Sequence, residues 1–307
     1  MTIWPGSFGN SKRQPVSRSA NDAAPIGVIG GSGLYDIEGF TNRREVRVAT
    51  PFGDPSDAYQ VGRLDGTPVA FLPRHGQGHR VSPTDVNSRA NIFGFKTLGV
   101  ERVISVSAVG SMREHIAPLD VVIPDQLIDR TRLRPLTFFG SGIVVHVGFA
   151  DPFCPELSGM MADAAEAIGT RVHRGGTYIC IEGPRFSTRA ESRAFRQWGA
   201  DIIGMTAIPE AILAREAELC YAALAMVTDF DVWHESEAPV TVDMVVANLV
   251  RNVATAKAAL RGALPRAAAA RQCGCGSALA GAIMTAPDRV PERIREDLRP
   301  LIGRYLT

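Results

Sequence analysis

The sequence predicts a single α/β domain with a twisted, largely parallel central sheet flanked by helices. Seven short apolar segments have strand length, and their apolar character is continuous rather than alternating, as is typical of strands covered on both faces. Helical patterns lie between several of these segments, and strands that alternate with helices favour a parallel sheet. With 307 residues, 45% of them hydrophobic, the chain is long enough to bury a full core.

The expected strands begin after a polar N-terminal stretch. The first, residues 26–29, runs into Gly30-Gly31-Ser32-Gly33. Six more apolar segments follow along the chain, at residues 69–72, 102–108, 120–123, 177–181, 201–205 and 222–227. In sheets of this kind ligands bind where loops leave the carboxyl ends of the strands. The residues just after each segment are therefore the candidates for chemistry.

Four helices are predicted between and after these strands. Ser82-Pro83 is typical of a helix start, with Ser as the cap and Pro at the first helical position. Thr188-Arg189-Ala190-Glu191 is a capping-box pattern, and it opens a helix that Gly199 ends. Residues 209–219 and 241–264 are helical by period and propensity.

The chain divides into three parts. Residues 1–24 mix Pro, Ser, Asn and scattered charges without a period, which predicts a disordered N-terminal extension. Residues 25–265 carry all the predicted strands and form the domain that we expect to be catalytic. Residues 266–307 form a C-terminal segment that we expect to be helical, with a clear period over 290–305, and to pack on the domain.

The composition argues against several classes of partner. The chain has 33 basic and 32 acidic residues, a net charge of +1, so no large field draws it toward nucleic acid or membrane. No apolar run approaches the roughly 20 residues that a spanning helix needs, and the N-terminus lacks the apolar core of a secretory signal. We therefore expect a cytoplasmic protein that binds neither nucleic acid nor membrane.

The five cysteines do not form a regular framework. Their odd number argues against a secreted disulfide scaffold. Cys273-Gly274-Cys275 is a CxC pair, and no His or second Cys pair follows it at the spacing of zinc ligands. Two interpretations of the pair stay open, two free thiols or a redox-dependent disulfide.

Three strand ends carry groups suited to binding an anion. Gly30-Gly31-Ser32-Gly33 offers backbone N–H groups and a hydroxyl, although it is equally compatible with a tight structural turn. Pro73-Arg74-His75-Gly76 offers a planar guanidinium and an imidazole donor. Its alternatives are a structural turn or a histidine phosphatase, which would need a second catalytic His that the sequence does not indicate. Ser105-Val106-Ser107-Ala108-Val109-Gly110-Ser111 adds hydroxyls, or is an ordinary strand end.

A pair of acids follows the last apolar segment, in Thr228-Asp229-Phe230-Asp231. Carboxylates at i and i+2 of an extended chain point to the same side, and in a cleft they would repel, so that one has a raised pKa. A protonated carboxyl beside a carboxylate can donate to a purine N7 and accept from an exocyclic amine. The alternatives are a solvated turn and a Mg²⁺ site, although no third carboxylate clusters here.

Taken together, these motifs resemble the trimeric purine nucleoside phosphorylases, and within them the branch that cleaves 5′-methylthioadenosine. The resemblance covers residues 26–264 and rests on residues 27–34, 50–53, 55–57, 74–76, 86–92, 181–186 and 199–206, which follow one another at family-like spacing. It implies a purine nucleoside phosphorylase-like fold and a homotrimer with active sites near subunit interfaces. It also implies that inorganic phosphate is a co-substrate, that no metal or organic cofactor takes part, and a place in purine and methionine salvage.

The resemblance further implies which residues form the site. Phosphate would be bound by Ser32, Arg74, His75, Ser107, Ala108 and Thr206. Phe186, Ser187 and Met205 would contact the base and ribose, and His146, Val240, Val242 and Val245 would enclose the 5′ substituent, partly from a neighbouring subunit. Asp229 would protonate N7 as the general acid, and Asp231 would orient Asp229 and bind the amine.

The choice of purine follows from two positions. Relatives that take 6-oxopurines carry an Asn after the Thr and a Glu in place of Ser187, whereas this chain has Asp229 and Ser187. An ionised Asp only accepts hydrogen bonds, so it prefers a 6-amino group, while an Asn amide can donate to a 6-oxo group. The resemblance therefore implies phosphorolysis of 5′-methylthioadenosine. The alternatives are a 6-oxopurine or methylthioinosine phosphorylase, a nucleosidase that uses water, and a non-catalytic purine-binding protein.

Overall fold

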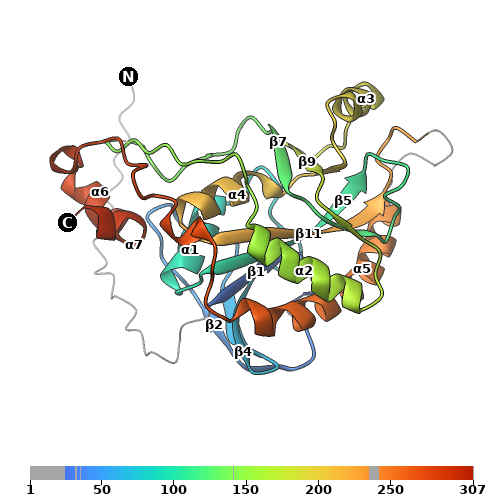
Figure 1. Ribbon diagram of the computed structural model, residues 1–307, viewed down its shortest axis with the longest axis horizontal. Helices are drawn as coiled ribbons and strands as arrows, with labels where there is room; N and C mark the ends of the chain where they lie inside the picture. Colours follow the sequence, from blue (N-terminus) through green and yellow to red (C-terminus); the bar gives the residue numbers. More distant parts are fainter. Residues whose placement is uncertain (1–24, 32, 35, 141, 235–241, 307) are drawn as a thin grey trace, which may run out of the picture.

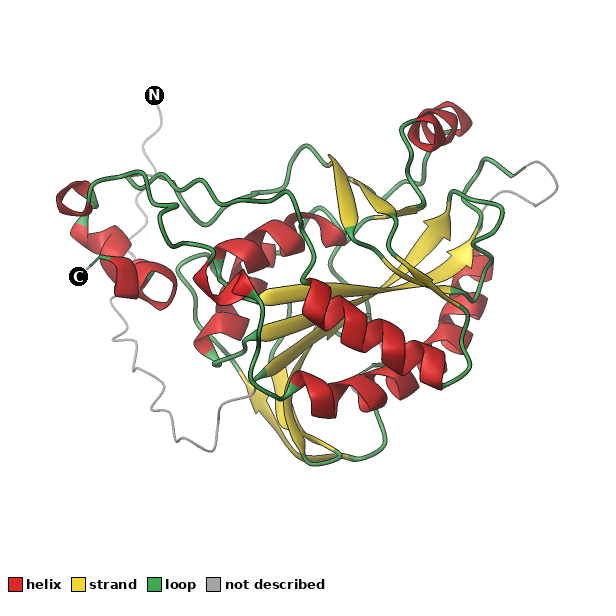
Figure 2. Cartoon of the chain, viewed as in Figure 1, coloured by secondary structure: helices red, strands yellow, loops and turns green. Residues whose placement is uncertain are grey.

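A mixed sheet of eleven strands runs through the centre of the described part of the chain, with helices on both faces (Figures 1 and 2). The computed structural model describes residues 25–306 apart from 32, 35, 141 and 235–241, and without the side chains of 242–247 and 249. The strands are β1 (Ile26–Gly30), β2 (Phe40–Val46), β3 (Tyr59–Leu64), β4 (Thr67–Pro73), β5 (Arg102–Ser111), β6 (Val121–Ile123), β7 (Gln126–Arg130), β8 (Val172–Arg174), β9 (Thr177–Ile181), β10 (Ile202–Gly204) and β11 (Cys220–Asp229).

The sheet is mostly parallel. Its main path runs β2-β3-β4-β1-β5-β10-β9-β7, while β11 pairs with β5 and β6, and β6 with β8. Parallel pairing joins β4, β1, β5 and β11, so the carboxyl ends of these four strands lie at the same end of the sheet. The antiparallel pairs are β2 with β3, β3 with β4, β10 with β5 and β11 with β6. The predicted fold class is therefore confirmed, with an antiparallel edge that the sequence did not predict.

The helices are α1 (Ser88–Thr97), α2 (Pro155–Ala167), α3 (Arg189–Gln197), α4 (Ala207–Glu216), α5 (Val242–Ala267), α6 (Glu292–Asp297) and α7 (Arg299–Ile302). Alternation along β11 decides which helices cover which face. Tyr221 and Ala223 pack in a cluster with residues of α1 and α4, whereas Ala222 and Leu224 pack with residues of α2 and α5. Because successive side chains of a strand point to opposite faces, two helix layers enclose the sheet (Figure 1).

Local capping sets the helix ends. Thr188 and Glu191 form the predicted capping box at the start of α3. The helix predicted from Ser82 is wrong at its start, because residues 83–85 form a turn and α1 begins at Ser88. Its cap is Asn87, whose side chain accepts from the N–H of Ala90. The Asn cap, four residues after Pro83, therefore decides where the helix begins.

The C-terminal segment continues past α5 as short helical turns. Besides α6 and α7, these are 3₁₀ helices at Gly274–Ser277, Pro287–Arg289 and Gly303–Tyr305. Leu279, Val290, Leu301 and Ile302 are buried in the cluster on the α1–α4 face. In the described part of the chain no helix is both long and apolar enough to cross a bilayer.

Candidate active site

A cavity of about 530 Å³ opens at the sheet edge where β4, β1, β5 and β11 end. The strand ends supply most of its wall, as expected for a parallel sheet. Ten predicted site residues line it: Arg74, His75, Ser107, Ala108, Phe186, Ser187, Met205, Thr206, Asp229 and Asp231. The structure thus brings together residues that are up to 157 positions apart in the sequence (231 minus 74).

The remaining predicted residues lie elsewhere or outside the described part. Ser32 and Val240 fall outside the described residues, although Gly31 lines the cavity. Val242 and Val245 belong to the first turns of α5, but their side chains are not described. His146 is exposed and does not line the cavity of its own chain; its backbone N–H donates to the carbonyl of Ala282.

Arg74 is buried at one end of the cavity and is held by an acid that the sequence analysis missed. Its guanidinium pairs with Glu210, with Nε–Oε1 at 2.5 Å and Nη2–Oε2 at 3.1 Å, and the two side chains are only 3% and 1% exposed. Nη2 also donates to the hydroxyl of Ser105 at 2.7 Å, and Nη1 to the carbonyl of Val106 at 3.0 Å. Among the described acceptors only that carbonyl takes a hydrogen of Nη1, so one N–H is left for an anion.

His75 is neutral at pH 7. Burial, and next the charge of Arg74, lower the pKa of His75 to about 4. Its Nδ1 lies 2.9 Å from the carbonyl of Val81, which can only accept, so Nδ1 carries the proton and Nε2 keeps its lone pair. From the sequence we expected His75 to donate a hydrogen bond to phosphate. In the neutral side chain the free ring nitrogen is instead an acceptor, suited to a protonated phosphate oxygen or a hydroxyl.

Several buried polar atoms of the cavity wall have no partner in the described part of the chain. They are Ser107 Oγ, Ser187 Oγ and Asp231 Oδ2. A buried polar atom without a hydrogen bond costs about 1–3 kcal/mol, and such atoms are rare in native proteins. Because three such atoms lie at one cavity, we expect its ligand to carry several hydrogen-bonding groups.

Asp229 and Asp231 face the cavity through a turn and not through an extended chain. Asp229 ends β11, but Asp231 has φ +53°, and its N–H donates to Asp229 Oδ1 at 2.8 Å. The extended chain that we expected to bring residues 229 and 231 to the same side is therefore wrong. An Asx turn, closed by the side chain of Asp229, brings the two carboxyls into the same cavity.

Both acids are buried, each 7% exposed, and burial raises the pKa of each above its ordinary value. For Asp229 the hydroxyl of Thr228, which donates to Oδ2 at 2.7 Å, and the N–H of Asp231 oppose this increase. For Asp231 the negative charge of Asp229 adds to it. A carboxyl with a raised pKa, in contact with the cavity, can hold a proton and deliver it to a bound base.

The backbone around these acids is fixed by α5 and by a close approach of β5. The side-chain amides of Asn248 and Asn252, one turn apart on α5, donate to the carbonyls of Thr228 and Val227. Gly110 of β5 lies against Asp229, and a Cβ there would be 2.9 Å from Asp229 Oδ1. Neither α5 amide nor Gly110 was singled out from the sequence, because their partners are distant in the chain.

Met205 also lines the cavity, and its backbone is held by a buried arginine. Arg134, 8% exposed, donates to the carbonyls of Met205 and Ile208, and it pairs with Glu182. Gly183, with φ +70°, has no side chain to displace the sulfur of Met205, which would lie 2.5 Å from a Cβ there. Next along the chain, the hydroxyl of Thr206 lies 3.1 Å from that of Tyr178. This network holds Met205 and Thr206 at the cavity wall.

Comparisons with known proteins agree with this geometry. A family model described as the phosphorylase superfamily matches residues 25–265. The S-methyl-5′-thioadenosine phosphorylase of Koribacter versatilis is 56% identical over 92% of this chain and 97% of that protein. The enzyme of the same name from Geobacter sulfurreducens is 57% identical over 92% of this chain and 99% of its own.

Solved structures give the same result. A methylthioadenosine phosphorylase sourced from an Antarctic soil metagenomic library superposes with a TM-score of 0.88 at 48% identity, covering 91% of this chain and 99% of its own. A methylthioadenosine phosphorylase from Schistosoma mansoni in complex with adenine superposes with a TM-score of 0.78 at 34% identity, covering 91% and 98%.

Proposed function

The chain belongs to the phosphorylase superfamily, and from that premise we propose that it cleaves 5′-methylthioadenosine with inorganic phosphate, giving adenine and 5-methylthioribose 1-phosphate. One observation carries the proposal: a single cavity is lined by a buried arginine, by serine hydroxyls and by two buried acids. The names of the relatives support the same reaction, and they do not favour the 6-oxopurine or methylthioinosine alternative.

Phosphate occupies the end formed by Arg74, His75, Ser107, Ala108 and Thr206. The free N–H of Arg74 and the unpartnered hydroxyl of Ser107 donate to its oxygens. The phosphate attacks C1′ as the glycosidic bond breaks, and its own negative charge stabilises the positive charge that develops on the ribose. Inorganic phosphate is the co-substrate, so the reaction needs no metal or organic cofactor.

Asp229 supplies the proton that the leaving adenine needs at N7. Its raised pKa keeps a protonated fraction available at higher pH than an exposed Asp would have. Asp231, whose Oδ2 has no partner among the described residues, accepts from the 6-amino group. A 6-oxo group would leave that oxygen facing another acceptor, which costs about 1–3 kcal/mol, or roughly tenfold or more in selectivity.

The 5′ end of the cavity needs a second copy of the chain. His146 is exposed near Val144 and Met284, which are 52% and 64% exposed. These two lie in loop segments that are joined by a hydrogen bond from the N–H of Met284 to the carbonyl of Val144. An exposed apolar pair beside a predicted site residue fits a subunit interface. We infer a homotrimer in which this segment encloses the methylthio group of a neighbouring site. The cytoplasmic location stays a prediction.

The test uses the variant Asp229→Asn together with an assay from which phosphate is omitted. Asp229→Asn keeps the shape of the side chain and removes the acid, so turnover on 5′-methylthioadenosine falls by about 10²–10⁴-fold. Asp163→Asn, an exposed acid in α2, is the control and keeps its turnover. Adenine release is measured with and without phosphate, beside hypoxanthine release from methylthioinosine. Adenine release without phosphate, preferential hypoxanthine release, or unchanged turnover of Asp229→Asn would each contradict the proposal.

A further inference from the structure

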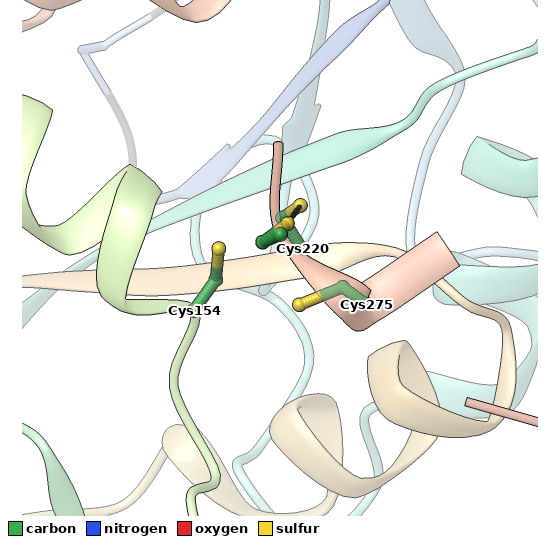
Figure 3. A group of neighbouring side chains, drawn as sticks. Cys154, Cys220 and Cys275 are labelled. Atoms are coloured by element: carbon green, nitrogen blue, oxygen red, sulfur yellow. Dashed lines mark hydrogen bonds between the residues drawn. The ribbon is translucent and has the colours of Figure 1, made fainter. Parts of the chain in front are cut away.

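Four cysteines converge at the end of the sheet away from the active site. The sulfurs of Cys154, Cys220, Cys273 and Cys275 all lie within 4.8 Å of one another. Three of the residues are buried and Cys273 is half-buried. Figure 3 shows Cys154, Cys220 and Cys275 close together on separate segments of the chain. Cys154 is the N-cap of α2, Cys220 begins β11, and the CxC pair follows α5.

The spacing of the sulfurs fits ligands of one ion. Four sulfurs about 2.3 Å from a central Zn²⁺ in a tetrahedron lie about 3.8 Å apart. The sulfurs of Cys220 and Cys273 lie 3.3 Å apart, well beyond the roughly 2.05 Å of a disulfide bond. The cluster is thus a compact group of four thiols with sulfur-only ligands, the donor set that selects zinc among common divalent ions.

The segments that carry the thiols are held in place by other contacts. Glu156 Oε2 accepts from the backbone N–H groups of Gln272 and Cys273, at 2.8 and 2.9 Å. The other oxygen of Glu156 accepts from the buried Arg102, whose Nη1 also donates to the carbonyls of Ala267 and Ala269. The CxC loop is therefore fixed against α2 and β5 by groups other than sulfur, as a preorganised site requires.

An ion can also reach the cluster from solvent. A second cavity, of about 660 Å³, is lined by Cys273, Gly274 and Cys275 and gives an ion a route from solvent.

We propose that Cys154, Cys220, Cys273 and Cys275 bind one Zn²⁺ as four thiolates, and that this ion ties the C-terminal segment to the domain. The role is structural, since β11 runs from Cys220 at the cluster to Asp229 at the active site. Nine residue steps of about 3.3 Å separate the two by roughly 30 Å. Four protein ligands also close the coordination sphere, which is typical of a structural site.

The test measures metal content in the full chain, purified without an affinity tag and with a reductant. We expect one zinc per chain in the wild type and in Cys180→Ala, which removes a buried thiol outside the cluster. Cys273→Ser/Cys275→Ser loses the zinc. Replacement of zinc by Co²⁺ gives the absorption bands of a tetrahedral cobalt–thiolate centre. A chelator lowers the Tm of the wild type, while kcat and KM at a temperature below both transitions stay unchanged.

Several results would overturn the proposal. A wild-type chain without zinc, with all its thiols open to alkylation or with disulfides evident from the mass after alkylation, would assign the cluster to free or oxidised thiols. Iron in place of zinc would refute the choice of ion. Zinc retained in a folded Cys273→Ser/Cys275→Ser variant would place the ion elsewhere. If that variant does not fold, the cobalt spectrum and the zinc content of the wild type still decide.

Discussion

Gly110→Ala tests whether the position of Asp229 limits the reaction. A Cβ at residue 110 would lie 2.9 Å from Asp229 Oδ1, 3.0 Å from Ile203 Cγ2 and 3.4 Å from Asp231 Cβ. Ordinary contacts begin near 3.4 Å, so the carboxyl of Asp229 must move by about 0.5 Å (3.4 minus 2.9). That shift strains the hydrogen bond from the N–H of Asp231 to Oδ1, now 2.8 Å long.

The kinetic effect follows from how strongly proton transfer depends on position. A displacement of about 1 Å can cost 10²-fold, so we expect kcat to fall by about tenfold to 10²-fold. Overpacking of the strand lowers the free energy of unfolding by about 1–3 kcal/mol. The KM for phosphate stays within about twofold, because Arg74 contacts β5 at Ser105 and Val106, at least four residues before Gly110.

The assay is initial-rate phosphorolysis of 5′-methylthioadenosine with phosphate varied, beside a urea unfolding curve. The control is Gly159→Ala in α2, where a Cβ would meet nothing within 4 Å. We expect it to keep its kinetics and to gain about 0.5–1 kcal/mol of stability, as helical Ala does over Gly. A Gly110→Ala enzyme that folds and keeps the wild-type kcat would refute the reasoning.

Two further predictions concern buried acids that the sequence did not indicate. Glu210→Gln leaves a donor of Arg74, Ser105 or Tyr221 without an acceptor. We therefore expect the KM for phosphate to rise more than kcat falls, and the free energy of unfolding to fall by about 1–3 kcal/mol. A lower KM in phosphate titrations would instead show that Glu210 only neutralises Arg74. Burial raises the pKa of Glu216 from 4.5 to about 7, so between these pH values the folded state binds a proton that the unfolded state has lost. The free energy of unfolding therefore falls as pH rises from 4.5 to 7, by up to about 3 kcal/mol at about 1.36 kcal/mol per pH unit. Glu216→Gln should flatten this pH dependence in urea unfolding curves, and an unchanged pH dependence would contradict the assignment.

Part of the fold could be predicted because its signal is local. β1 and β11 are buried along their whole length, and β5 and β9 along most of theirs. Their residues are mostly apolar, and that pattern is visible in the sequence. The strand β2 was missed because it reads FTNRREV and is mostly exposed at the sheet edge. A signal was available for its neighbour β3, which was also missed. Asp65-Gly66, both with positive φ, form the tight turn between β3 and β4, and that dipeptide indicates a hairpin.

The sequence by itself determined which groups are available and at which strand ends they lie. Arg74, Ser107 and Asp229 each follow or end an apolar run, and parallel strands must present such residues at one edge. Only the tertiary structure decided how these groups are paired, how deeply they are buried and which distant residues join them. Glu210 reaches Arg74 across 136 residues, the turn at Asp231 replaces an extended chain, and Cys154 and Cys220 join a CxC pair that has no zinc spacing in the sequence. Burial and pairing depend on which distant segments pack together, and no local pattern contains that information.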